Sequence, residues 1–191
     1  MDPAQLERYS RHLLLPEIDF AGQQQLMNSS VLIVGAGGLG SPAAMYLAAS
    51  GIGHLVLADH DHVDLGNLQR QLLHSTADIG RPKTESGRDR LLAINPEVRV
   101  ETIAVRLDRE TMTKKAAEVS VVLDATDNFE TRFALNLACI AAGKPLVLGA
   151  AARLQGQLTV FDHRRDDSPC LTCLYPDEED ADTPDCVAGG V

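Results

Sequence analysis

Short runs of consecutive apolar residues recur along the chain, and longer amphipathic stretches separate most of them. The clearest apolar runs are 31–34, 55–58, 121–123 and 146–148. Strands of this kind are buried on both faces, which is typical of a parallel sheet covered by helices. A weaker run over 98–104 and an alternating segment over 157–162 complete the predicted sheet.

The stretches between these runs have helical periodicity. Predicted helices cover 39–50, 81–94, 109–118 and 129–142, and 4–15 forms an N-terminal helix that we expect outside the domain or against a partner. Alternating strands and helices predict an α/β fold with a doubly wound, mostly parallel, Rossmann-like sheet and helices on both faces. We expect a single domain over 1–191 in which 163–191 is loop.

Length and charge narrow the class of protein. The 191 residues are 45% hydrophobic, enough for a buried core. The formal net charge of -10 argues against nonspecific binding to nucleic acid or to an anionic membrane. No apolar run approaches the roughly 18 residues of a membrane span, and the charged start is unlike a secretory signal. We therefore expect a cytoplasmic protein whose four cysteines are thiols, metal ligands or catalytic groups.

A glycine-rich loop follows the first predicted strand and opens a helix. It contains Gly35, Gly37, Gly38 and Gly40. Glycine lets the backbone approach a phosphate closely, and the helix N-terminus offers free N–H groups. The loop predicts a nucleotide site, although a tight turn without a ligand is the alternative. Asp59 ends the second strand, where this fold places an acid that binds ribose hydroxyls.

The loop and the acid fit NAD as well as ATP, so an NAD-linked dehydrogenase is an alternative. Polar residues farther on favour a triphosphate. Asp61, Asn67 and Arg70 follow closely, and Lys83 lies in the first turn of the next predicted helix. A cation there opposes the helix dipole, and a bound anion would reverse that penalty. We predict that Arg70 and Lys83 bind the triphosphate, whereas exposed surface charges are the simpler alternative.

Asp127 lies just after the 121–123 strand. A carboxylate at the C-terminal edge of a parallel sheet can hold Mg²⁺ on phosphate oxygens. Asp127 also fits, with Glu130, a capping arrangement for the following helix, and both roles are compatible. We expect Asp124 to be a structural acid, and His60 and His62 to be solvated rather than metal ligands.

In their order, these motifs resemble the ubiquitin-activating-like adenylyltransferases of sulfur-carrier pathways, the group of molybdopterin-synthase adenylyltransferase and ThiF. The resemblance covers nearly the whole chain. It rests on RYSR at 8–11, GAGGLG at 35–40, NLQRQ at 67–71, RPK at 81–83, DATDN at 124–128, GQLTV at 156–160 and PCLTC at 169–173.

The resemblance implies ATP-dependent activation of the C-terminal glycine carboxylate of a small ubiquitin-fold sulfur carrier that ends in Gly-Gly. The products would be an acyl adenylate and pyrophosphate, in molybdopterin or thiamine biosynthesis. The substrate carboxylate itself attacks, so no protein nucleophile is required. Catalysis would then depend on alignment and on neutralisation of phosphate charge.

The family's residue roles carry over to matching positions. The glycine loop would lie beside the adenosine and the α-phosphate, Asp59 would bind the ribose, and Asp127 would coordinate Mg²⁺. Arg11 resembles an arginine that reaches into the ATP site of a neighbouring protomer, which implies a homodimer. The phosphates would be held by Asn67, Arg70 and Lys83.

The cysteines depart from the family's pattern. Cys170 and Cys173 resemble half of a structural Zn²⁺ site, which needs four ligands, and the family's second pair would lie beyond Val191. Redox use of the pair fits less well, because we expect Cys170 to follow Pro169 in a loop instead of opening a helix.

Cys186 stands where thiamine-type members carry a cysteine that links to the carrier's thiocarboxylate, and a loop thiol without that role is the alternative. The resemblance also implies that the family's domain continues past Val191. We therefore expect a chain incomplete at its C-terminus. A noncatalytic fragment that binds ATP or dimerises is a further alternative.

Overall fold

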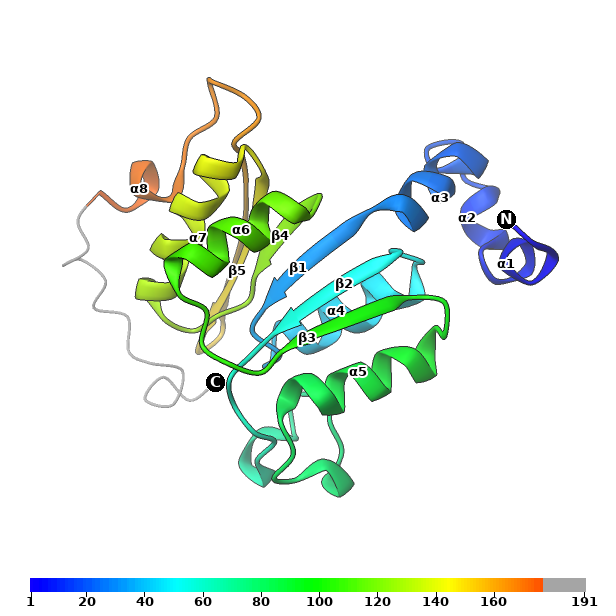
Figure 1. Cartoon of the computed structure of the whole chain (residues 1–191), viewed down its shortest axis with the longest axis horizontal. Helices are drawn as coiled ribbons and strands as arrows, with labels where there is room; N and C mark the ends of the chain where they lie inside the picture. Colours follow the sequence, from blue (N-terminus) through cyan, green and yellow to red (C-terminus); the bar gives the residue numbers. More distant parts are fainter. Residues whose placement is uncertain (177–191) are drawn as a thin grey trace.

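A single mixed sheet organises the molecule. The computed structural model describes residues 1–176 and contains a six-stranded sheet of order β3-β2-β1-β4-β5-β6 (Figure 1). The first five strands are parallel, and β6 is antiparallel to β5. This confirms the predicted doubly wound sheet. The strands are β1 (Ser30–Val34), β2 (His54–Ala58), β3 (Arg99–Ile103), β4 (Val121–Asp124), β5 (Pro145–Ala152) and β6 (Gln155–Asp162).

Helices cover both faces of this sheet, as predicted, and each face has its own core. On one face, Val31 and Ile33 of β1 share a cluster with residues of α4 (Gly40–Ala49) and α5 (Lys83–Ile94). On the other face, Leu32 and Val34 pack with residues of α6 (Arg109–Glu118) and α7 (Phe129–Ala142). Alternate side chains of a strand point to opposite faces, so both are apolar here.

The start of α7 differs from the expected capping arrangement. Asn128 is the N-cap, and its side-chain oxygen accepts a hydrogen bond of 2.9 Å from the Thr131 N–H. The prediction that Asp127 caps this helix with Glu130 is therefore wrong. Asparagine is among the preferred N-cap residues, and it leaves the Asp127 carboxylate without a capping role.

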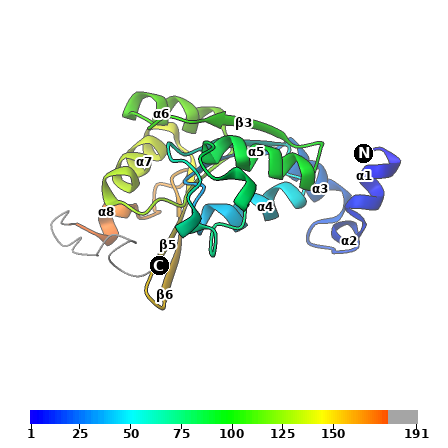
Figure 2. The ribbon, with the colours of Figure 1, turned by 90° about the horizontal axis from the view of Figure 1, so that it is seen from below.

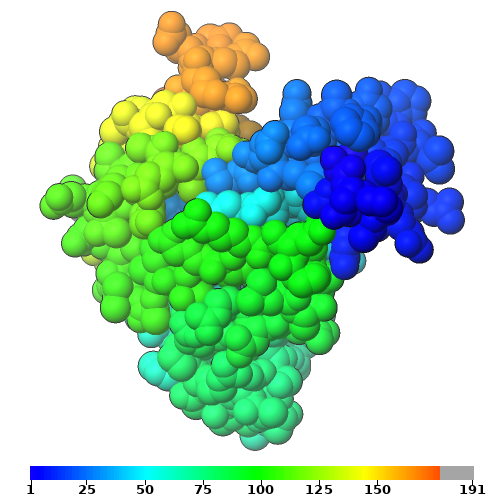
Figure 3. Space-filling model, turned by 45° about the vertical axis from the view of Figure 1, so that its right-hand side comes forward, coloured from blue at the N-terminus to red at the C-terminus, as the bar shows by residue number. Residues whose placement is uncertain are grey.

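The N-terminal arm consists of α1 (Pro3–Arg8), α2 (Ser10–Leu13) and α3 (Asp19–Asn28), at the opposite end of the molecule from α8 (Figures 1 and 2). The prediction of one helix over 4–15 is wrong, because Tyr9 interrupts the helix between α1 and α2. This side chain is 2% exposed, and its hydroxyl accepts a hydrogen bond of 2.9 Å from Asn95. Helix α3 was not predicted from the sequence, because its apolar residues hardly form a continuous face. The arm stands out from the body in Figure 3.

The segment after β6 is not loop throughout. A single turn, α8 (Leu171–Leu174), follows a hairpin that projects from the body in Figure 2. Leu171 is buried in the core on the α7 face, and its N–H donates to the Asn136 side-chain oxygen at 3.0 Å. One apolar anchor thus orders a turn that lacks a periodic pattern. Within residues 1–176, no helix is long and apolar enough to cross a membrane.

The glycine loop packs closely against the backbone that follows β4. Gly35 has a φ of +96°, and a Cβ there would lie 2.6 Å from the Ala125 carbonyl oxygen. A Cβ on Gly40 would overlap the Gly35 carbonyl oxygen. Glycine is therefore required at both positions, since any side chain would push β1 and α4 away from the loop that follows β4.

We expect Gly40→Ala to lower the free energy of unfolding by about 2 kcal/mol or more, because the added methyl group cannot be accommodated without backbone movement. Urea unfolding followed by circular dichroism measures this change. Gly37→Ala is the matched control, because a Cβ at Gly37 would make only an ordinary 3.7 Å contact with Gln71. Equal losses in the two variants would contradict the prediction.

Candidate nucleotide site

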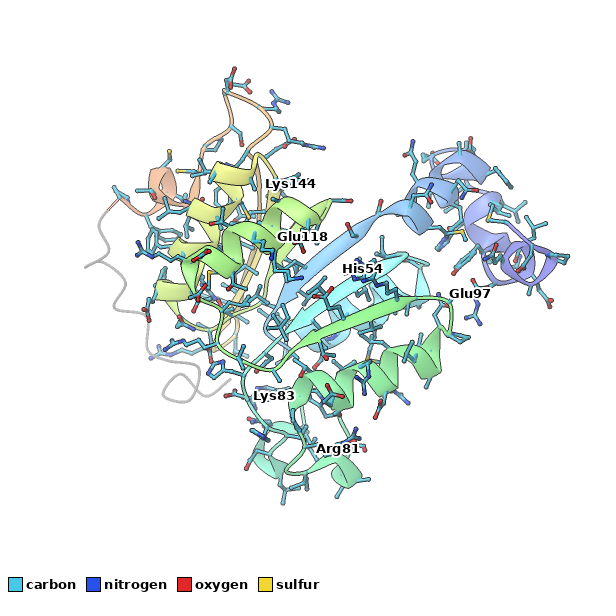
Figure 4. All side chains as sticks on the ribbon, in the orientation of Figure 1. His54, Arg81, Lys83, Glu97, Glu118 and Lys144 are labelled. Atoms are coloured by element: carbon cyan, nitrogen blue, oxygen red, sulfur yellow. The ribbon has the colours of Figure 1, made fainter. Side chains whose placement is uncertain are left out.

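A cleft with a volume of about 280 Å³ opens where β1, β2 and β4 end. Chain order reverses between β1 and β4, and open α/β sheets bind ligands at such a switch point. Figure 4 shows Lys83 at this end of the sheet, with Glu118 and Lys144 toward the other. Of the residues predicted for the site, those that line the cleft are Gly35, Gly37, Gly38, Asp59, Asp61, Arg70, Lys83 and Asp127.

Backbone hydrogen bonds orient the Asp59 carboxylate. One of its oxygens accepts from the Ala36 N–H at 2.7 Å, and the other accepts from the Asp61 N–H at 2.8 Å. A carboxylate oxygen has a second lone pair, so each oxygen can still accept a bond from a hydroxyl. Asp59 thus joins the glycine loop to the end of β2 and keeps its capacity to bind a ribose.

Lys83 and Asp61 form an ion pair at one wall of the cleft. The Lys83 Nζ donates to a carboxylate oxygen of Asp61 at 3.0 Å. Lys83 is 4% exposed, whereas the Asp61 side chain is 57% exposed. Burial raises the pKa of Asp61, but the hydrogen bond and charge of Lys83 outweigh it, so the net pKa is lowered. A buried cation is thereby held where a phosphate can reach it.

A turn that begins with the 3₁₀ segment η1 (Leu65–Asn67) positions Arg70. The Asn67 carbonyl accepts hydrogen bonds from the Arg70 N–H at 3.2 Å and the Gln71 N–H at 3.0 Å. The Arg70 side chain lies over Gly38. Asn67 itself does not line the cleft, nor does Gly40, which packs beneath the loop. The structure therefore separates these two from the other predicted site residues.

The two acids after β4 have different environments. Asp127 is exposed and lines the cleft. Asp124 is fully buried and accepts hydrogen bonds from the N–H and hydroxyl of Thr126, at 2.9 and 2.7 Å. Burial raises the pKa of Asp124. Asp124 is a structural acid, as expected, and Asp127 is the carboxylate available to a ligand.

The cleft also contains residues that the sequence analysis did not single out. Arg106 and Arg132 line it together with Arg70 and Lys83. An Arg132 Nη donates to the Thr126 carbonyl oxygen at 2.7 Å, and the guanidinium lies 5.5 Å from the centre of the Phe129 ring. Four cations around one cleft favour an anionic ligand. Arg132 lies one helical turn after Asn128, at the start of α7. This spacing is the signal in the sequence by which its place at the cleft could have been found.

Four predicted site residues lie elsewhere or outside the described part. Arg11 is exposed on α2 and does not line the cleft of its own chain. Cys186 lies outside the described residues. Cys170 is the N-cap of α8, so the expectation that it does not open a helix is wrong, and its Sγ lies 3.6 Å from that of Cys173.

Three potential metal ligands at the cleft lie close together. Ligand atoms of Asp59, His60 and Asp61 are within 4.8 Å of one another, and residues 1–176 contain no other such group. His60 is exposed, in agreement with the expectation that it is solvated.

The switch-point cleft, the glycine loop and the surrounding cations define a nucleotide-binding domain of the Rossmann-like type. More particularly, the chain belongs to the ThiF family, whose model matches residues 9–191. This confirms the resemblance on which the sequence interpretation depends.

Known relatives are longer than this chain. The SAMP-activating enzyme E1 of Haloferax volcanii is 45% identical over 100% of this chain and 70% of its own length. The sulfur carrier protein ThiS adenylyltransferase of Escherichia coli is 44% identical over 100% and 75%. The E. coli molybdopterin-synthase adenylyltransferase is 50% identical over 87% and 67%. Among solved structures, E. coli MccB with ATP has a TM-score of 0.76 at 27% identity, over 96% of this chain and 60% of that one.

We expect Asp61→Asn to lower the free energy of unfolding near neutral pH by about 1 kcal/mol, because Lys83 loses a charged partner while solvent screens the exposed carboxylate. Lys83 lowers the pKa of Asp61. The stabilisation is therefore complete above the usual aspartate pKa and is lost as the pH falls through the lowered value.

Urea unfolding of both proteins from about pH 6 down to about pH 2 measures the effect, and the gap between them should narrow with falling pH. Asp166→Asn, in the loop after β6, is the control for removal of an exposed carboxylate. A gap that stays constant over this range would disprove the contribution of the pair.

Proposed function

We propose that this chain is an ATP-dependent adenylyltransferase that activates the C-terminal glycine carboxylate of a ubiquitin-like sulfur carrier. The observation that carries the proposal is the convergence of Arg70, Lys83 and Asp127 on one cleft beside the glycine loop. Membership of the ThiF family places the chain among the nucleotidyltransferases, and the names of its relatives support the carrier as substrate. The pathway is molybdopterin or thiamine biosynthesis.

The reaction uses the substrate's own nucleophile. A carboxylate oxygen of the carrier attacks the α-phosphorus of ATP, and the bond to the bridging oxygen breaks. The electron pair leaves with pyrophosphate, and the acyl adenylate remains. Negative charge develops on the phosphate oxygens, so the cations of Arg70 and Lys83 stabilise the transition state more than the ground state. The loop and Asp59 contribute alignment.

Binding of the triphosphate would give Lys83 a new partner. In the structure, its Nζ is held by Asp61. A phosphate oxygen in the cleft would compete for the same ammonium group, and the triphosphate as a whole carries more negative charge than one carboxylate. Asp61 then becomes available as an oxygen ligand. The ion pair gives the buried ammonium group a partner before the nucleotide arrives, which avoids the cost of an unpaired buried cation.

Mg²⁺ fits the donors of this cleft. The Asp127 carboxylate is exposed there, and Asp61 adds a second carboxylate on the same cleft. Mg²⁺ prefers a few carboxylate ligands together with phosphate oxygens and water. When bound, it neutralises phosphate charge. Asp127 would hold it on the phosphates and, with Asp61, would orient the nucleotide.

Zn²⁺ fits Cys170 and Cys173 as half of a structural site. Their sulfurs are 3.6 Å apart, close to the edge of about 3.8 Å that tetrahedral Zn–S bonds require. Within residues 1–176, no third ligand completes the group. The proposal therefore places the other ligands outside the described part of the protein. The covalent role of Cys186 stays a prediction.

A homodimer is the proposed working assembly. Arg11 is exposed on the N-terminal arm, and the same arm exposes large apolar side chains. Leu14 is 73% exposed and Phe20 is 54% exposed. Large exposed apolar side chains are the material of which protein interfaces are made. A second copy that covers them would allow Arg11 to reach the cleft of its partner.

We expect ATP–pyrophosphate exchange that depends on a carrier ending in Gly-Gly, and Asp127→Ala should lower its rate by about 100-fold or more, because charge neutralisation at the phosphates is lost. Radiolabelled pyrophosphate incorporated into ATP provides the measurement, with Asp166→Asn as the control.

Exchange that is unchanged by Asp127→Ala, or that proceeds without the carrier, would refute the proposal. ATP binding without any exchange would identify a noncatalytic nucleotide-binding fragment. Tighter binding of NADH than of ATP would favour a dehydrogenase.

The role of Arg11 in trans predicts complementation between two inactive variants. Arg11→Ala and Lys83→Ala should each lose activity, but co-refolded as a mixture they should regain about one quarter of the wild-type rate. Half of randomly formed dimers are mixed, and each mixed dimer contains one intact site. Exchange assays on the mixture and on each variant alone test this, and no recovery in a confirmed mixed dimer would exclude the role in trans.

A further inference from the structure

A buried histidine lies behind the glycine loop, outside the set of residues assigned to the reaction. His74 is 7% exposed and lies between the loop and α5. Its Nε2 is 3.1 Å from the Ala36 carbonyl oxygen, and its Nδ1 is 2.9 Å from the Ser86 hydroxyl oxygen. Both ring nitrogens therefore have a partner, one on the loop and one on the helix that begins with Lys83.

These partners determine which nitrogen carries the proton. A carbonyl oxygen can only accept, so Nε2 carries the hydrogen and donates it to Ala36. Nδ1 then accepts from the Ser86 hydroxyl in the neutral ring. Burial lowers the pKa of His74 below its usual value, which favours the same neutral form.

The Ala36 peptide groups are held on both sides. The Ala36 N–H donates to Asp59 at 2.7 Å, and the Ala36 carbonyl also accepts from the Ser41 hydroxyl at 3.1 Å. Ala36 is fully buried. With His74, three side chains thus determine the orientation of one residue of the loop.

The geometry of a trans peptide extends this constraint to the next residue. The carbonyl of Ala36 and the N–H of Gly37 belong to one planar unit and point in opposite directions. The Ala36 carbonyl points inward to His74. The Gly37 N–H therefore points the opposite way, toward the cleft that Gly37 lines. Among residues 1–176, no acceptor takes this N–H. It is a donor available to a phosphate.

We propose that His74 is a positioning residue for the nucleotide: it holds the Ala36 carbonyl inward and thereby directs the Gly37 N–H into the cleft. The same contact keeps Ala36 in place as the donor that orients the Asp59 carboxylate. The inference rests on the proposed function only in that ATP is the ligand of the cleft.

Two amide substitutions separate the two hydrogen bonds of the ring. The glutamine amide of His74→Gln reaches the position of Nε2 and can still donate to Ala36. The shorter amide of His74→Asn reaches only the position of Nδ1, so it keeps the Ser86 contact and loses the Ala36 contact. Isothermal titration calorimetry with Mg·ATP and thermal unfolding are measured for both variants and for the wild type.

We expect His74→Asn to raise the Kd for ATP about five- to tenfold, the effect of one lost hydrogen bond, while His74→Gln stays within about twofold of the wild type. Both variants should lower the Tm, because each loses one buried contact. Equal Kd values for His74→Asn and His74→Gln would overturn the role of His74. So would a Kd that rises in proportion to the loss of Tm in both variants, whether or not the hydrogen bond to Ala36 is kept.

Ser41→Ala keeps the test decisive if His74→Asn does not fold. It removes the other side-chain donor to the same carbonyl at a helix position that suits alanine. We expect a Kd increase of about two- to fivefold, together with a lower Tm because a buried hydrogen bond is lost. An unchanged Kd in Ser41→Ala would then overturn the inference, whereas a wild type that binds no ATP would instead refute the proposed function.

Discussion

The close packing of the glycine loop against the end of β4 is the constraint on which the site depends. Gly35 and Gly40 let backbone meet backbone where a Cβ would collide with a carbonyl oxygen. This contact brings the end of β1, the start of α4 and the loop with Asp127 together at one edge. Without it, the cations and carboxylates that line the cleft would belong to separate surfaces.

Charge in the cleft is arranged in two different ways. Lys83 is buried and held by a single carboxylate, whereas Asp127 is exposed and has no capping role. A buried cation in a low-dielectric wall interacts strongly with an anion, and an exposed carboxylate is free to meet a hydrated metal ion. The chain as a whole carries a charge of -10, so any attraction for an anionic ligand comes from the cations at the cleft.

Buried polar side chains connect the cleft to the rest of the fold. His74, Ser41 and Ser86 lie behind the loop, and Asn95 anchors Tyr9 of the N-terminal arm. Each satisfies a hydrogen bond that the apolar core cannot provide, which is the condition for burying such groups. The arm that carries Arg11 and the loop that faces the cleft are both held in this way.

The sequence by itself determined the sheet, its covering helices and most of the residues at the cleft, because apolar runs and a glycine-rich turn are local signals of burial and close approach. Only the tertiary structure decided that Asn128 caps α7, that Tyr9 divides the N-terminal helix and that Leu171 orders α8. It also brought Arg132 to the cleft and His74 behind the glycine loop. Tyr9, Leu171 and His74 depend on partners far along the chain, and no local pattern predicts which distant hydrogen bond or pocket a side chain will find. The partner of Asn128 is only three residues away, and there the backbone geometry selected Asn128 over Asp127 as the cap.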